Sequence, residues 1–129
     1  MKDRVYVVCS GPSMKGFDFN RLATEDTIVV NLAYKYVPEW KYMVAIDACV
    51  FDTMKNTGGD ASWNRDRVIY TRDYFDNGHK IPYHIKSNDQ YLHILRMRNS
   101  SNVLEERHGL LCCRNNSGYM GVSLAIRLG

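Results

Sequence analysis

The chain opens with a short apolar run that ends abruptly in small, turn-forming residues. Residues 5–9 read VYVVC, and the loop SGPS follows at residues 10–13. An unbroken apolar run predicts a strand that is buried on both faces, as in a parallel sheet covered by helices. The loop at residues 10–13 is therefore expected at the carboxyl end of a parallel strand, the edge at which open α/β sheets bind their ligands.

Two further apolar runs in the first half of the chain also end in a polar residue. Residues 27–30 end at Asn31, and residues 40–46 end at Asp47. Residues 67–71 predict a fourth strand. Helical segments are expected at residues 17–22, with Phe17, Phe19 and Leu22 as apolar anchors, and at residues 32–36 and 50–55.

The second half is patterned less regularly. Residues 73–81 are expected to form a loop, residues 83–85 a short edge strand, and residues 89–97 a helix. The clearest element is a helix over residues 118–128, which Asn116 and Ser117 can cap. Small residues on this helix would permit close packing on the sheet; they are Gly118, Gly121, Ser123 and Ala125.

Together these elements predict an α/β fold, a Rossmann-like three-layer domain with a mainly parallel sheet. Residues 1–129, with 45% hydrophobic and 24% charged residues, are typical of one ordinary domain. A nucleotide-type ligand is expected at the carboxyl edge of the sheet, across a switch point at which the strand order reverses.

Composition and charge exclude several classes of protein. The net charge of +3 comes from 17 basic and 14 acidic residues without a basic run, so no nucleic-acid partner is expected. No stretch is long and apolar enough for a membrane span, and no secretory leader is apparent. The cysteines are expected to be reduced thiols, with Cys9 in a buried strand, and the protein is expected in the cytoplasm. A structural zinc site is not expected, because no pair of cysteines or histidines has the required spacing.

The loop after the first strand has the chemistry of an anion site. Gly11 lets a ligand approach the backbone, Pro12 fixes φ, and Ser13 offers a hydroxyl and its own N–H. It is neither a Walker loop, because Phe17-Asp18 stand where Lys-Ser/Thr should, nor a G-x-G-x-x-G dinucleotide loop. An ordinary turn that ends a strand is the alternative.

The start of the last predicted helix could complete this site. A helix amino end presents unpaired N–H groups and a partial positive charge, which together hold a phosphate or carboxylate. Asn116, Ser117 and Gly118 would contribute these groups, and an ordinary N-cap without a ligand is the alternative.

Four segments together resemble a known superfamily; they are residues 10–18, 31–34, 46–47 and 116–129. The chain is similar to the Rossmann-like group of bacterial CMP-sialic-acid-dependent sialyltransferases, motility accessory factor glycosyltransferase-like proteins and 6-hydroxymethylpterin diphosphokinases, which has phage relatives. The resemblance covers nearly the whole chain, and its first and last motifs are the most specific. It implies a bacterial protein, or a phage protein acting in the host cytoplasm.

The resemblance implies a nucleotide-sugar-dependent glycosyltransferase with a CMP- or CDP-type donor. The expected nucleotide-binding residues are Gly11, Pro12, Ser13, Asn31, Asp47, Asn116, Ser117 and Gly118. One alternative is a diphosphokinase that acts on a small alcohol with Mg²⁺ held by Asp47 and Asp52. A catalytically silent nucleotide-binding or interaction module is the other. No cofactor is expected under the first and third interpretations.

Members of this superfamily usually continue beyond the last helix, and the sialyltransferases carry their histidine base there. The resemblance therefore implies that the family's C-terminal portion is missing after Gly129. Of the histidines present, His84 beside Tyr83 is the candidate for an acid or base role. A sheet edge left open in this way would favour a homo-oligomer.

Overall fold

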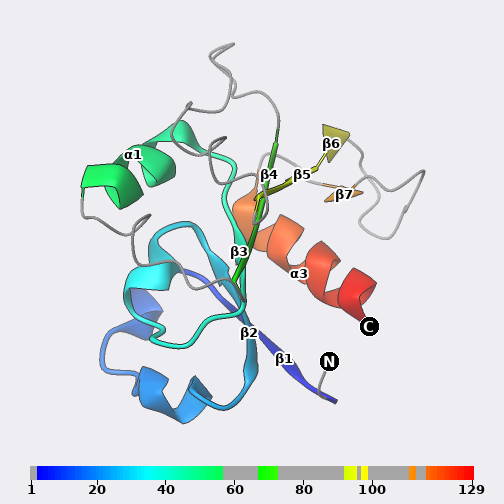
Figure 1. Ribbon diagram of the computed structural model, residues 1–129. Helices are drawn as coiled ribbons and strands as arrows, with labels where there is room; N and C mark the ends of the chain where they lie inside the picture. The colour runs from blue at the N-terminus through cyan, green and yellow to red at the C-terminus, as the bar shows by residue number, and fades with distance from the viewer. Residues whose placement is uncertain (1–2, 57–66, 73–91, 96, 99–110, 113–115) are drawn as a thin grey trace.

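A parallel sheet organises the protein. The computed structural model describes residues 3–56, 67–72, 92–95, 97–98, 111–112 and 116–129. Five strands form the main sheet (Figure 1): β1 (Val5–Val8), β2 (Asp26–Val30), β3 (Tyr42–Val44), β4 (Val68–Arg72) and β5 (Leu92–Leu95). A separate two-stranded parallel sheet is formed by β6 (Met97–Arg98) and β7 (Leu111–Cys112). The prediction of a small α/β domain with a parallel sheet is confirmed.

The strands of the main sheet follow one another in chain order. Each pairs in parallel with the next, from β1 beside β2 to β4 beside β5. The order therefore does not reverse among these five strands, and the expected switch point is wrong for them. A ligand site must therefore be located from the loops that follow the strands at the carboxyl edge of the sheet.

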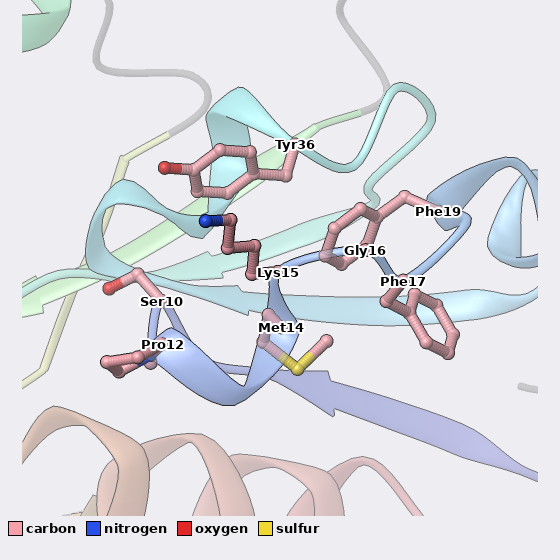
Figure 2. Close-up of a pocket in the computed structure, with 9 residues that line it drawn as sticks. Ser10, Pro12, Met14, Lys15, Gly16, Phe17, Phe19 and Tyr36 are labelled. Atoms are coloured by element: carbon pink, nitrogen blue, oxygen red, sulfur yellow. The ribbon is translucent and has the colours of Figure 1, made fainter.

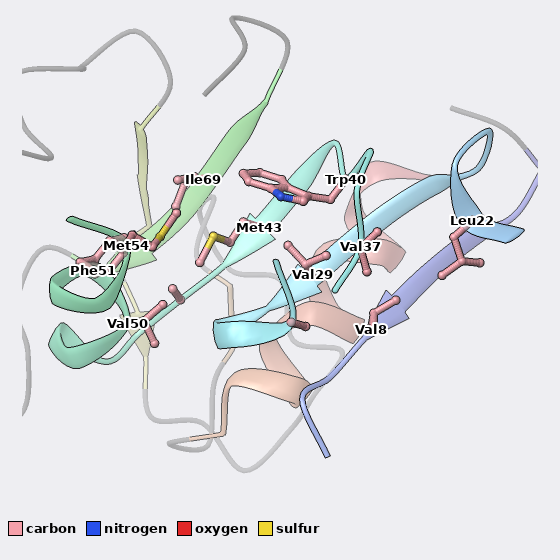
Figure 3. Packing of buried hydrophobic residues seen from close by; sticks show 12 residues of the cluster. Val8, Leu22, Val29, Val37, Trp40, Met43, Val50, Phe51, Met54 and Ile69 are labelled. Carbon is pink, nitrogen blue, oxygen red and sulfur yellow. The ribbon is translucent and has the colours of Figure 1, made fainter. Parts of the chain in front are cut away.

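One face of the sheet is covered by short helices (Figure 3). They are the 3₁₀ helices η1 (Pro12–Met14), η2 (Phe19–Leu22) and η3 (Asn31–Lys35), and the α-helix α1 (Ala48–Asn56). Phe51 and Met54 of α1 are buried with Met43 and Ile69 of the sheet, and Trp40 closes the same cluster. The helical segments predicted at residues 17–22, 32–36 and 50–55 are thus confirmed.

The opposite face is covered by α3 (Ser117–Leu128), which lies across the sheet from α1 (Figure 1). Met120 and Leu124 are fully buried against Ile28, Val44 and Ile46. Since β2 is enclosed from both sides, its residues from Thr27 to Val30 are all buried. This explains why its sequence is apolar without alternation.

Two sequence-based expectations are wrong in their local structure. The apolar spacing in residues 89–97 predicted a helix, but residues 92–95 form β5 and residues 97–98 form β6. A short apolar run has no reliable period, and here pairing with β4 decides its conformation. Phe17 is not a core anchor, because it is 41% exposed, whereas Leu22 is buried.

The remaining predictions concern the middle of the chain and the last helix. The loop at residues 73–81 and the edge strand at residues 83–85 lie outside the described residues. The capped helix at residues 118–128 is confirmed as α3. None of the described helices is long and apolar enough to cross a membrane.

Candidate functional site

The carboxyl ends of β1, β2 and β3 meet at one edge of the sheet. In the parallel register, Val8 is paired with Val29, and Val30 is paired with Val44. The residues that follow these strands therefore emerge side by side, as predicted for the loop after β1, Asn31 and Asp47. The order of β1, β2 and β3 in the sheet places Asn31 between the other two strand ends.

The loop after β1 leaves the backbone of Gly11 accessible. Gly11 has φ −76° and ψ 158°, an extended conformation that any residue adopts. A Cβ atom at this position would meet only Ser13 Oγ, at 3.6 Å. Neither backbone strain nor packing therefore requires glycine at position 11. The absence of a side chain leaves the backbone of Gly11 accessible to a ligand. Gly16 differs, because its φ of 86° favours glycine by itself.

Turn hydrogen bonds hold the loop in shape. The Met14 N–H donates to the Gly11 carbonyl at 3.0 Å, and the Lys15 N–H donates to the Pro12 carbonyl at 3.1 Å. These bonds form the single 3₁₀ turn of η1, which Pro12 begins with a fixed φ. The Ser13 side chain on this turn is exposed to solvent.

Asn31 has the most unusual conformation among the residues of the site. It is the one described non-glycine residue with a positive φ, at 52°, and it is the first residue of η3, directly after β2. Its side-chain Oδ1 atom is buried and has no hydrogen-bond partner among the described residues. A left-handed residue and a buried acceptor without a donor each cost free energy, about 1–3 kcal/mol apiece. The unpartnered acceptor at this sheet edge makes Asn31 a candidate contact for a ligand.

The start of α3 packs against the end of β1. Asn116 is the N-cap, and its Oδ1 atom accepts a hydrogen bond from the Tyr119 N–H at 3.1 Å. Gly118 lies so close to β1 that an added Cβ would stand 3.4 Å from Cys9 Sγ and 3.2 Å from Asn116 Oδ1. The structure therefore brings the two motifs together. At the start of α3, the Asn116 side chain is already hydrogen-bonded as the helix cap. Ser117 beside it is buried, with 8% of its surface exposed.

Cys9 is exposed, which corrects the expectation that it lies inside a buried strand. The physical reason is that pairing with β2 ends at Val8, so Cys9 already belongs to the loop. Its thiol is still partly withdrawn from water, and this burial raises the pKa of Cys9 above the usual 9.0. At neutral pH the group beside Gly118 is therefore an uncharged thiol.

A cleft of about 600 Å³ opens beside the same loop (Figure 2). Its walls are formed by Ser10, Gly11, Pro12, Met14, Lys15, Gly16, Phe17, Phe19 and Tyr36. The Phe19 ring contacts Phe17 edge-on, with centroids 5.1 Å apart, and stacks with Tyr36 at 5.9 Å. One wall of the cleft is therefore aromatic, and it faces the loop after β1 that is predicted to bind an anion.

Sequence reasoning missed three of these side chains, namely Lys15, Phe17 and Tyr36. Lys15 and Phe17 come two and four residues after Ser13 of the glycine-proline-serine motif, and that short spacing was a signal for placing them at the site. Tyr36 is 55% exposed although it follows an apolar segment, and no pattern in the sequence distinguishes it from a core residue.

The other predicted residues are placed as follows. Gly11 and Pro12 line the cleft, whereas Ser13 does not. Asp47 and Asp52 are both exposed, at the start of α1 and within it. Among the described residues no group of three or more His, Cys, Asp or Glu side chains could hold a metal ion. His84 lies outside the described residues.

Comparison of the chain with protein-family models, with curated proteins and with solved structures found no match.

Proposed function

We propose that the chain binds a nucleotide at the carboxyl edge of β1 and β2 and is a glycosyltransferase-like protein of the Rossmann-like, three-layer type. The donor would be a CMP- or CDP-linked sugar, as in the sialyltransferase-like group that the motifs resemble. The observation that carries the proposal is Asn31, whose left-handed backbone and unpartnered Oδ1 atom lie at this edge. A ribose hydroxyl or an exocyclic amine of a base is the kind of donor that this oxygen lacks.

The surrounding residues support an anionic ligand. Gly11 exposes its backbone, Ser13 adds an exposed hydroxyl, and the amino end of α3 lies against the end of β1. In the proposed reaction the bond between the sugar carbon and the nucleotide phosphate breaks, and the phosphate takes the electron pair. Backbone N–H groups and hydroxyls stabilise this leaving group, so that the sugar carbon develops oxocarbenium character. The acceptor oxygen then bonds to that carbon and gives up its proton to a base.

A calorimetric titration of CMP, CDP, UDP, GDP and ATP, each with and without Mg²⁺, tests the proposal. We expect CMP or CDP to bind without metal. Binding of ATP that requires Mg²⁺ would instead support diphosphate transfer with Asp47 near the metal. If none of the five nucleotides binds, the proposal is wrong and a silent interaction module is the better description.

A variant at Gly11 locates the binding site. Because an added side chain meets open space there, Gly11→Val should fold normally but block the approach of a phosphate to the backbone. Ala23→Val is the matched control, since Ala23 is exposed at the end of η2 and away from the loop. Equal nucleotide affinity in both variants would reject the site.

A further inference from the structure

The cleft beside the loop combines flat apolar surfaces with one positive charge. Tyr36 is 55% exposed and Phe17 is 41% exposed, so both rings offer a free surface to a ligand although they belong to a packed aromatic group. Exposed aromatic side chains that line a concave site are typical of surfaces on which a planar ring stacks.

Lys15 supplies the charge. Its side chain points from the loop toward the Tyr36 ring (Figure 2). Among the described residues that line the cleft it is the one charged side chain, and none is acidic. The cleft therefore favours a ligand that has a planar ring and carries negative charge.

The size of the cleft agrees with such a ligand. A volume of about 600 Å³ lies within the range of about 300–1,000 Å³ that small-molecule sites occupy. Gly11 and Pro12 belong both to the proposed anion loop and to the wall of the cleft. A single nucleotide can thus contact the loop with its phosphate and extend its base along the aromatic wall.

We infer that this cleft is the base subsite of the nucleotide, in which Tyr36 stacks on the base and Lys15 pairs with the phosphate. The inference rests on the proposed function and assigns to it Tyr36 and Lys15, which are not among the nucleotide-binding residues expected from the sequence. Stacking on an aromatic side chain accepts every base, because each base has a π face. Stacking on Tyr36 would therefore not by itself select among the bases.

Calorimetric titration of cytidine and CMP into the wild-type protein and single variants separates the two roles. Tyr36→Ala should weaken the binding of both ligands by at least about fivefold, the lower end of the range for base stacking. Tyr36→Phe keeps the ring and should restore binding. Lys15→Ala should weaken CMP by at least about threefold and leave cytidine unchanged, because only CMP carries a phosphate.

Matched controls come from the same protein. Tyr6 is 38% exposed on β1, and Lys35 is exposed on η3; neither lines the cleft. Tyr6→Ala and Lys35→Ala should bind both ligands as the wild type does. Thermal unfolding of each variant shows whether loss of the stacking between Tyr36 and Phe19 has affected the fold.

The outcomes distinguish this inference from the function on which it rests. Binding of CMP that is equal in Tyr36→Ala and Tyr6→Ala would overturn the base subsite and leave nucleotide binding in place. Loss of cytidine binding in Lys15→Ala to the same extent as CMP binding would overturn the role of Lys15. Failure of the wild type to bind any nucleotide would refute the proposed function, and the base subsite with it.

Discussion

Gly121 of α3 lies directly against Val7 of β1. A Cβ atom at position 121 would stand 2.9 Å from Val7 Cγ1 and 3.0 Å from Val30 Cγ2, closer than ordinary side-chain contacts allow. The absence of a side chain at this one position lets α3 approach the sheet. Since α3 also brings Gly118 next to Cys9, this close approach positions the helix start at the candidate site.

Gly121→Ala is expected to destabilise the protein. The added methyl group would have to displace α3 from β1 and β2, and overpacking of this kind costs about 1–3 kcal/mol, against a helix-propensity gain of about 1 kcal/mol from replacing glycine, so a net loss of up to about 2 kcal/mol is expected. Urea unfolding measures the change. Val122→Ala is the control, because Val122 is the next residue and is 46% exposed. A Gly121→Ala protein as stable as the wild type would show that the helix adjusts without cost.

Asn31→Gly separates the strain of this residue from its function. Glycine adopts the φ of 52° more easily than asparagine and removes the unpartnered Oδ1 atom, and these gains offset the roughly 1 kcal/mol that glycine costs through the entropy of the unfolded chain, so the free energy of unfolding should not fall below that of the wild type. The variant also removes the buried Oδ1 atom, and nucleotide affinity should fall by at least about tenfold if that atom accepts a hydrogen bond from the ligand. Unfolding and calorimetric titration of the same sample measure both quantities.

One result would contradict the prediction for Asn31→Gly. Wild-type affinity in a folded Asn31→Gly protein would mean that the Oδ1 atom has no ligand. In that case, its unusual conformation would be only a consequence of the tight connection between β2 and η3.

The helix cap at Asn116 allows charge and capping to be varied separately. Aspartate caps as well as asparagine does, so Asn116→Asp should preserve the bond to the Tyr119 N–H and the stability of α3. It also adds a negative charge beside the proposed phosphate, which should weaken CMP binding. Asn116→Ala should instead lower the free energy of unfolding by about 0.5–2 kcal/mol. If CMP binds Asn116→Asp as tightly as the wild type, the amino end of α3 does not face the phosphate.

The sequence predicts the part of the fold that repeats one simple pattern. Continuous apolar runs identified β1, β2, β3 and β4, and the polar residues after the first three correctly marked the carboxyl edge. The order of the strands could not be predicted in the same way, since it depends on pairing between segments that are far apart in the chain. Residues 92–95 (LHIL) illustrate this, because so short a segment suits a helix or a strand equally well until a neighbouring strand is present.

The site was predictable only in its backbone motifs. Turn-forming residues such as Gly11 and a polar strand end such as Asn31 can be recognised from local sequence alone. The left-handed conformation of Asn31 and the exposure of Tyr36 depend on how η3 returns over the sheet, which no local pattern encodes. Aromatic residues are usually buried, so sequence reasoning assigns them to the core unless the surrounding fold is known.

Cys9 provides a probe of the site that does not depend on catalysis. Alkylation by iodoacetamide requires the thiolate, and burial raises the pKa of this thiol above 9.0. The rate at Cys9 in the folded protein should therefore be low at pH 7–8, increase about tenfold with each pH unit, and level off only above pH 9.0. In urea the burial is lost, so the unfolded chain should react faster than the folded protein at pH 8. Mass spectrometry of the peptide that contains Cys9 follows its alkylation separately from the other cysteines.

Bound CMP should slow the reaction further, because Cys9 lies beside Gly118 at the proposed phosphate position. A folded protein that reacts at pH 8 as fast as the unfolded chain would contradict the raised pKa, and a rate indifferent to saturating CMP would place the nucleotide elsewhere.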